Sequence, residues 1–386
     1  MDQIKTYKKK DSFVKLENKK NFEINSLNKT IITALNKENI INSLNNDEKD
    51  IIKSLKKDFL NDSKENDPKI FKLKENTIAE INTFSESKDI IKYLIHRYKY
   101  EIFPVIKKIS DYPPLVQIEP SSICNFRCVF CFETDKTFTD KKSGHMGTMK
   151  LELFKKIIDE IEGKVQFVTL ASRGEPLVSK EINEMIKYTS GKFLNLKINT
   201  NASLLTEEKI HAILSSNVKT MVFSADAADS DLYKKLRVNG SLEKTIANIK
   251  KFKEIHNKHY ANNKIITRVS GVKFSKEQNF EEMKKLWGDL VDQVAFVDYN
   301  PWENSYEKKP NGLSTPCSDL WRRMFIWWDG KINPCDVDYK SKLSVGNVLN
   351  KKIDNLWNSD FYNNLRKKHL ENKRQSISPC NACTVI

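Results

Sequence analysis

The chain has 386 residues, enough for two or three domains with at least one sizeable hydrophobic core. Hydrophobic residues make up 39% of it and aromatic residues 10%, which excludes an intrinsically disordered protein. The formal charge is +15, but the lysines and arginines are scattered along the chain, so we do not expect nucleic acid as a partner. No run of about 18 apolar residues occurs and the basic start has no apolar core, which predicts a cytoplasmic protein without a membrane partner.

Residues 1–110 form the first predicted unit, a helical region that contains no glycine. Isoleucines and leucines recur at helical spacing over Ile31–Leu44 and Ile51–Leu60, and another helix is predicted from Ser87 to about Tyr100. Between them, Asp62–Pro68 is typical of a linker. The unit has no catalytic pattern, and Phe22–Asn25 with the helices after it is compatible with a degenerate peptide-binding wing.

The second predicted unit, residues 111–300, alternates short apolar runs with amphipathic segments. The predicted strands are Leu115–Ile118, Val165–Leu170, Leu194–Ile198, Val218–Phe223, Ile266–Val272 and Val294–Val297. The predicted helices are Met149–Ile161, Lys180–Tyr188, Thr206–Leu214, Leu242–Ile255 and Glu277–Leu290. Such a series predicts parallel strands covered by crossover helices. A doubly wound sheet and a partly closed barrel fit it equally well, although no glycine-rich nucleotide loop follows the first strand.

The third predicted unit, residues 301–386, holds four of the seven cysteines and no longer alternates strands with helices. Turn signals such as Asp329-Gly330 and Asn333-Pro334 are frequent in it. In a cytoplasmic protein the seven cysteines are not expected to form disulfides. We therefore predict a small C-terminal domain held together by a metal centre.

Three cysteines follow the first strand directly, at Cys124, Cys128 and Cys131. Three thiolates within eight residues can surround one metal centre, and they leave one iron of a [4Fe–4S] cluster open for chemistry. A zinc site and structurally buried cysteines are the alternatives, but the loop contains no histidine.

This CxxxCxxC pattern, with the aromatic Phe130 before its last cysteine, resembles the radical S-adenosylmethionine (SAM) superfamily. The resemblance implies an α/β fold in which residues 111–300 form a partial (β/α)6 barrel of the TIM type. It also implies a [4Fe–4S] cluster whose open iron chelates SAM, and reductive cleavage of SAM to a 5′-deoxyadenosyl radical. In that arrangement Phe130 lies in the cofactor site.

Further matches to the superfamily stand at successive strand ends, where sites of β/α folds lie. Gly174-Glu175-Pro176 resembles the GGEP turn that receives the methionyl amine, with Arg173 in place of the first glycine. By the same resemblance, Thr200 and Asn201 match a TNG segment, Ser224 and Asp226 hold the ribose hydroxyls, and Arg237 pairs with the SAM carboxylate.

The last four cysteines, Cys317, Cys335, Cys380 and Cys383, resemble the SPASM and Twitch extensions of radical SAM enzymes. Four cysteines supply full ligation for one auxiliary [4Fe–4S] cluster, which makes two clusters in the chain. A structural zinc site is the competing interpretation of this spacing.

The leading functional hypothesis is an oxidoreductase that abstracts hydrogen from a small polyol or aminosugar and passes an electron to the auxiliary cluster. It needs an electron donor such as flavodoxin or ferredoxin. Modification of a peptide or protein substrate is the alternative, and a zinc-stapled nucleic-acid-binding protein is the alternative of another class. Asp298 and Tyr299 end the sixth strand and are candidate proton acceptors, unless they only cap the strand.

Overall fold

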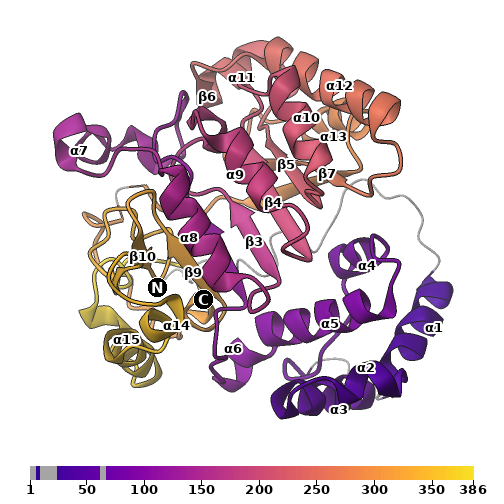
Figure 1. The fold of residues 1–386 in the computed structure, drawn as a ribbon. Coiled ribbons are helices and arrows are strands. Elements are labelled where there is room, and N and C mark those ends of the chain that lie inside the picture. The colour runs from indigo at the N-terminus through magenta and orange to yellow at the C-terminus, as the bar shows by residue number, and fades with distance from the viewer. Residues whose placement is uncertain (1–5, 9–23, 61–66, 304) are drawn as a thin grey trace.

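The computed structural model describes residues 6–8, 24–60, 67–303 and 305–386 (Figure 1). Phe22 and Glu23 of the predicted peptide-binding wing lie outside the described residues, as do residues 62–66 of the predicted linker. Within the described ranges, every helix is too short or too polar to reach across a lipid bilayer.

The N-terminal region is helical, as predicted. Its helices are α1 (Ile24–Leu35), α2 (Glu38–Asn42), α3 (Asn46–Leu60), α4 (Glu75–Ile81), α5 (Ser87–Glu101) and α6 (Phe103–Ile106). Apolar side chains of α1, α3 and α5 share one buried cluster, which also includes Leu115 and Phe167 of the sheet. The His96 ring stacks on Phe167 with the ring centroids 3.8 Å apart. The helical region therefore packs against the strands where they begin.

One nine-stranded sheet runs through the rest of the molecule, in the order β11-β10-β9-β1-β3-β4-β5-β7-β8. Its central strands are β1 (Leu115–Ile118), β3 (Phe167–Leu170), β4 (Asn195–Thr200), β5 (Thr220–Ser224), β7 (Ile266–Lys273) and β8 (Gln293–Asp298). All six pair in parallel, for example Val116 with Val168 and Ile198 with Met221. These are the six predicted strands, with shifts of one or two residues at their ends.

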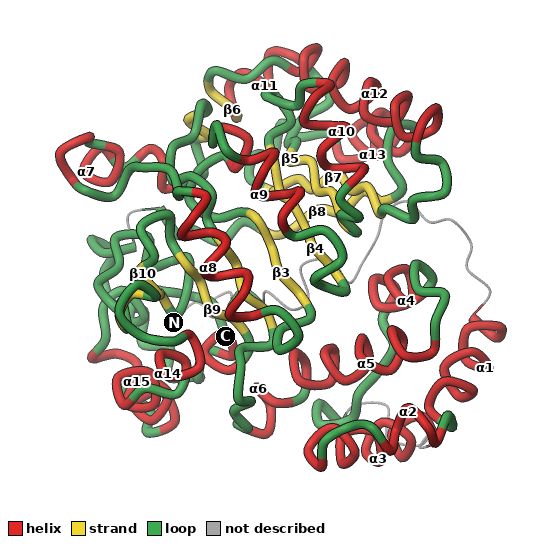
Figure 2. The backbone as a smooth tube through the Cα atoms, in the orientation of Figure 1, coloured by secondary structure: helices red, strands yellow, loops and turns green. Residues whose placement is uncertain are grey.

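The order of these strands decides between the two predicted architectures. The six strands lie side by side in the order in which the chain makes them, as in a barrel, whereas a doubly wound sheet reverses its order at a switch point. The partial barrel is therefore confirmed. Figure 2 shows the strands side by side with the crossover helices outside them.

The crossover helices are α8 (Leu151–Ile161), α9 (Ile182–Tyr188), α10 (Glu207–Ser215), α11 (Ser230–Leu236), α12 (Leu242–His259) and α13 (Phe280–Gly288). The starts of the last four are encoded locally, since the side chains of Thr206, Asp229, Ser241 and Asn279 each accept a hydrogen bond from a backbone N–H of the first turn. Helix α8 buries Phe154, Ile157, Ile158 and Ile161, one side of its surface, against the sheet.

The C-terminal segment extends the sheet instead of forming a separate layer. Strand β9 (Arg323–Ile326) pairs in parallel with β1, with Met324 opposite Val116. Strands β10 (Lys331–Asn333) and β11 (Gly346–Asn347) then continue in antiparallel fashion, and α14 (Ile353–Trp357) and α15 (Asp360–Leu370) follow. The predicted boundary after residue 300 thus divides parts that share one sheet, and it stays a prediction.

Candidate active site

The three-cysteine loop begins where β1 ends and is shaped by its own backbone. The Cys131 N–H donates to the Cys128 carbonyl over 3.0 Å, and Arg127 Nη1 donates to the Cys124 carbonyl over 2.8 Å. The short strand β2 (Arg127–Cys128) pairs with β6 (Arg237–Val238), which places Cys128 opposite Arg237. The loop is therefore tied to the segment after α11.

Gly174 lets the turn after β3 approach this loop closely. A Cβ atom at position 174 would lie 2.4 Å from the backbone carbon of Ser122, closer than any side chain permits. Directly after it, the Glu175 N–H donates to the Ile123 carbonyl over 3.0 Å. The glycine is thus needed for contact between the two backbones, and Arg173 at the preceding position does not disturb that contact.

A cavity of about 1550 Å³, including its open mouth, lies at the carboxyl ends of the barrel strands. Most of the predicted site residues line it together: Cys124, Cys128, Phe130, Cys131, Gly174, Glu175, Thr200, Asn201, Ser224, Arg237, Asp298 and Tyr299. Of the predicted set in the core, Pro176 and Asp226 are buried and do not line the cavity.

Glu175 is buried, and the protein already supplies hydrogen bonds to its carboxylate. Thr200 Oγ1 donates to Oε1 over 2.6 Å, and the Asn201 N–H donates to Oε2 over 2.7 Å. Burial raises the pKa of Glu175, while these hydrogen bonds and the nearby Arg237 oppose the rise. An ammonium group placed in the cavity would favour the ionised carboxylate further. Binding of the methionyl amine by Glu175 stays a prediction. A carboxylate that is held in place at the cavity wall is chemically suited to bind an ammonium group.

Arg237 forms an ion pair at the base of the cysteine loop. Its Nη2 lies 2.5 Å from Asp226 Oδ2, and its Nη1 lies 3.8 Å from Cys128 Sγ. Asp226 also accepts the Val272 N–H over 2.5 Å and has no exposed surface. Asp226 therefore holds Arg237, and of the predicted ribose pair only Ser224 lines the cavity.

The loop cysteines are chemically suited to bind iron. Burial raises the pKa of Cys124 to about 12 and raises that of Cys131 well above its usual value. Thiolates are costly in such surroundings unless metal cations neutralise them. The same cysteines converge on a cavity large enough for a cofactor, so the residues present fit a cluster with SAM beside it.

The four C-terminal cysteines meet at a second, smaller cavity of about 420 Å³. Cys317, Cys335, Cys380 and Cys383 all line it, although they come from segments far apart in the chain. Burial raises the pKa of Cys317 to about 11. Arg374 fixes the last turn, since its Nε donates to the Cys380 carbonyl and its Nη2 to the Cys383 carbonyl. This donor set fits one cubane cluster with a cysteine on every iron.

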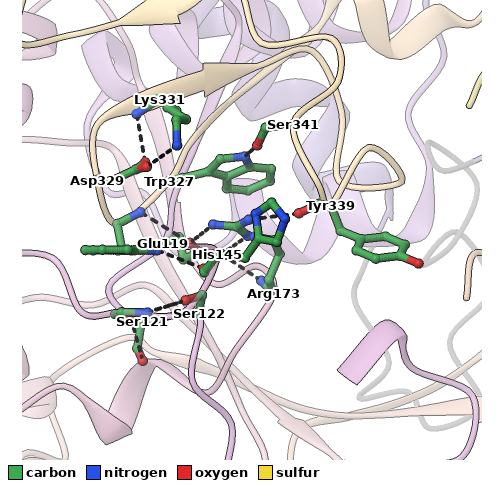
Figure 3. A network of polar contacts seen from close by, with 12 residues as sticks. Glu119, Ser121, Ser122, His145, Arg173, Trp327, Asp329, Lys331, Tyr339 and Ser341 are labelled. Carbon is green, nitrogen blue, oxygen red and sulfur yellow. Dashed lines mark hydrogen bonds and ion pairs between the residues drawn. The ribbon is translucent and has the colours of Figure 1, made fainter. Parts of the chain in front are cut away.

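Sequence reasoning missed the ion pair between Glu119 and Arg173, drawn in Figure 3. Arg173 Nε and Nη2 donate to the two Glu119 oxygens over 2.7 and 2.6 Å, and Nη1 donates to the Tyr339 carbonyl over 2.9 Å. The guanidinium also lies 4.2 Å from the Trp327 ring centroid. The departure from the GGEP pattern thus joins the core site to the C-terminal domain.

The polar floor of the cavity was also missed. Lys197, Asn199 and Gln117 line it from β4 and β1, and Arg323 lines it from β9. A signal was available in β4, where polar residues at 195, 197 and 199 alternate with buried Leu196 and Ile198. In a parallel strand, which is usually apolar on both faces, this alternation indicates a polar barrel interior.

Asp298 and Tyr299 lie on the cavity wall, as predicted from their place at the end of β8. Lys273 Nζ lies 3.8 Å from the Asp298 carboxylate, which is 46% exposed. The Tyr299 hydroxyl donates to Glu303. Burial and this carboxylate raise the pKa of Tyr299 above its usual range, so the phenol stays protonated.

Two protein families match the chain in tandem. The radical SAM superfamily matches residues 118–286, and SPASM, an iron–sulfur cluster-binding domain, matches residues 317–384. The first range contains the three-cysteine loop and the second contains all four C-terminal cysteines. This result favours iron–sulfur ligation over the zinc interpretation of the C-terminal cysteines.

Three relatives are similar over different lengths. The AdoMet-dependent heme synthase of Methanosarcina barkeri is 26% identical over 193 residues. The match covers 50% of this chain and 51% of the heme synthase, so this chain spans only about half the length of that relative. The subtilosin biosynthesis protein AlbA of Bacillus subtilis is 22% identical over 63% of this chain and 59% of AlbA. The SAM-dependent 2-deoxy-scyllo-inosamine dehydrogenase of Niallia circulans is 20% identical over 70% of this chain and 93% of the dehydrogenase.

Solved structures share the fold. SuiB of Streptococcus suis bound to its precursor peptide SuiA superimposes with a TM-score of 0.54 and 18% identity, covering 73% of this chain and 72% of SuiB. The structure of anSMEcpe with bound AdoMet superimposes with a TM-score of 0.51 and 15% identity, covering 70% of this chain and 88% of anSMEcpe. At these identities the similarity is one of fold, and it agrees with the predicted α/β architecture.

Proposed function

The chain belongs to the radical SAM superfamily and carries a SPASM domain after its core, and from this premise we propose that it oxidises an alcohol on a small polyol or aminosugar. In this reaction a carbinol H–C–O–H becomes C=O by losing one hydrogen atom, one proton and one electron. When bound, SAM and the core [4Fe–4S] cluster supply the 5′-deoxyadenosyl radical that takes the hydrogen atom, and the auxiliary [4Fe–4S] cluster supplies a one-electron acceptor.

The four cysteines around the second cavity carry this proposal. Because they can ligate every iron of one cubane, the auxiliary site leaves no iron to bind a substrate and is suited to electron exchange. The two cavities are also neighbours along the chain, since Cys335 lines the smaller one and Asp336 lines the larger one. An electron leaving a substrate in the larger cavity would have a short path to the smaller one.

The proton has a candidate acceptor in this geometry. The Asp298 carboxylate lines the cavity and is half exposed, so it can take a proton from a substrate hydroxyl and release it to water. Tyr299 stays protonated and donates to Glu303, which suits it to orient a substrate oxygen rather than to accept a proton. We assign Asp298 the acceptor role and Tyr299 the orienting role.

The proposal includes an external electron donor of the flavodoxin or ferredoxin type and a cytoplasmic location. The similarity to a 2-deoxy-scyllo-inosamine dehydrogenase over 70% of the chain supports a small-molecule substrate. Reduction of the core cluster by such a donor would begin each turnover, and the substrate's electron would return to the donor pool through the auxiliary site.

The test uses anaerobically reconstituted full-length protein with a panel of polyols and aminosugars that includes 2-deoxy-scyllo-inosamine. We expect one SAM consumed per product and a product 2 Da lighter than the substrate. The Cys380→Ala/Cys383→Ala variant should form no product but still release 5′-deoxyadenosine. A redox-neutral product, or SAM that is regenerated during turnover, would refute the oxidation.

Peptide modification is the second candidate, and one contact of this chain favours it. Tyr7 forms a parallel bridge with Val385: its N–H donates to the Thr384 carbonyl over 2.9 Å, and its carbonyl accepts the Ile386 N–H over 3.0 Å. Tyr7 also lines the large cavity. An extended backbone can therefore pair at the cavity edge, as a substrate peptide would. Mass spectrometry of peptides co-expressed with the protein tests this candidate.

A further inference from the structure

His369 on α15 lies at the auxiliary cavity in a fully buried position. Its side chain lines that cavity together with all four cysteines, and none of its surface is exposed to solvent. Its Nδ1 lies 3.2 Å from the backbone nitrogen of Cys317, a predicted cluster ligand. The ring is therefore positioned by the same loop that carries this cysteine.

This contact determines which ring nitrogen carries the proton. A backbone N–H is only a donor, so Nδ1 must be the acceptor and cannot itself be protonated. The proton of the neutral imidazole is then on Nε2. Among the described residues, no hydrogen-bond partner is found for Nε2, which is buried. A buried N–H without an acceptor is costly, so its surroundings are expected to supply one when the site is complete.

Among the described residues that line this cavity, Arg374 is the second one whose side chain carries N–H groups, and its hydrogen bonds differ from those of His369. Its Nε, Nη1 and Nη2 each donate to a backbone carbonyl, those of Cys380, Thr315 and Cys383. Arg374 thus fixes the polypeptide around the cavity through all three of its nitrogens, whereas His369 Nε2 has no partner among the described residues. Sulfide and thiolate sulfurs of a cluster are acceptors of the kind that this N–H lacks.

We propose that His369 donates an Nε2–H hydrogen bond to the auxiliary cluster, at a sulfide or a cysteine sulfur, and thereby raises its reduction potential. The added electron increases the negative charge on the sulfurs, so an N–H donor stabilises the reduced cluster more than the oxidised one. His369 in this way makes the cluster a better acceptor. The inference rests on the presence of the auxiliary cluster and not on the oxidation of any particular substrate.

Two substitutions of His369 distinguish the acceptor role of Nδ1 from the donor role of Nε2. In His369→Asn, the amide oxygen can take the place of Nδ1 and accept the Cys317 N–H, but nothing replaces Nε2. In His369→Gln, the amide nitrogen can reach the place of Nε2 and donate toward the cluster. Both are made in a Cys124→Ala/Cys128→Ala/Cys131→Ala background, so that the auxiliary cluster is the only one titrated.

The readout is the midpoint potential of the auxiliary cluster from an EPR-monitored redox titration, together with about four irons per chain as a control. We expect His369→Asn to lower the potential by at least about 59 mV, which corresponds to a tenfold weaker affinity for one electron. His369→Gln should recover most of the loss. An unchanged potential in His369→Asn with its iron retained would overturn the proposal.

A second measurement covers the case in which His369→Asn does not keep its cluster. The parent background protein, labelled with 15N-histidine, is reduced and its hyperfine couplings are recorded in H2O and D2O. We expect a 15N coupling and an exchangeable proton coupling from one histidine at the reduced cluster. Absence of both couplings would overturn the proposal, whatever the stability of the variant.

Discussion

The Arg173 guanidinium and the Glu119 carboxylate form a bidentate ion pair, with both partners almost completely removed from solvent. Glu119 follows β1, and Arg173 precedes the Gly174–Pro176 turn of the predicted SAM site. Glu119 also accepts the Trp328 N–H over 3.2 Å, and Arg173 donates to the Tyr339 carbonyl. The pair therefore connects the wall of the larger cavity with the C-terminal polypeptide that contains the last four cysteines (Figure 3).

Replacing one partner of this ion pair should destabilise the protein more than replacing both partners. Arg173→Met leaves the Glu119 carboxylate buried without its partner, which we expect to cost about 3–5 kcal/mol of stability. Arg173→Met combined with Glu119→Gln removes the stranded charge and should recover part of the loss. Thermal unfolding of the anaerobically purified proteins measures both effects. Equal destabilisation of the single and the double variant would contradict the interpretation.

The iron content should divide between the two cysteine sets. We expect about eight irons per chain in the reconstituted protein, because three and four cysteines support one cubane each. Cys124→Ala/Cys128→Ala/Cys131→Ala should lose about half of the iron and all cleavage of SAM. Iron and sulfide assays with an absorption spectrum check this, and unchanged iron in the triple variant would show that the loop does not hold a cluster.

SAM binding should depend on Glu175 and Arg237. A charge-assisted hydrogen bond is worth about 1.5–3 kcal/mol, so Glu175→Ala should weaken SAM binding roughly ten- to a hundred-fold with both clusters retained. Arg237→Ala should weaken it similarly, and it also leaves Asp226 buried without its ion pair. Equilibrium binding of SAM by the iron-loaded variants is the measurement. Glu181→Ala, which changes a carboxylate outside the lining residues of the cavity, serves as the control. Wild-type affinity in both test variants would disprove the assignment.

Lys197 should make stability depend on pH. Burial, followed by the charges of Arg323 and Arg268, lowers the pKa of Lys197 to about 7 from the 10.5 expected in an unfolded chain. Between these values the unfolded chain binds more protons, so stability rises with pH from about 7 to about 10.5.

Replacing the half-buried ammonium of Lys197 removes this cost. Lys197→Met should stabilise the protein by about 1–3 kcal/mol at pH 7, and the difference should shrink as pH rises and vanish above about 10.5. Thermal midpoints at several pH values test this. The control is Lys180→Met, which changes an exposed lysine and should give no pH-dependent difference. A Lys197→Met variant that is less stable than wild type at pH 7 would show that the ammonium is stabilised by its surroundings.

The amino-acid sequence alone was sufficient for the features that depend on neighbours along the chain. The alternation of apolar runs and amphipathic segments predicted six parallel strands and their helices, because side-chain periodicity is a local property. The spacing of Cys124, Cys128 and Cys131 predicted the cluster loop for the same reason. Most of the core residues that the resemblance to the radical SAM superfamily singled out, including Glu175 and Arg237, line one cavity, and their roles there stay predictions.

The tertiary structure alone decided the contacts between distant segments. Nothing local in Arg323–Ile326 indicates that this strand joins β1, or that Arg173 finds Glu119. Nor does spacing show that His369 turns toward the cavity of the four cysteines. Such contacts are made by residues tens to hundreds of positions apart, and they depend on how all the elements pack together. Local periodicity and motif spacing carry no information about that packing.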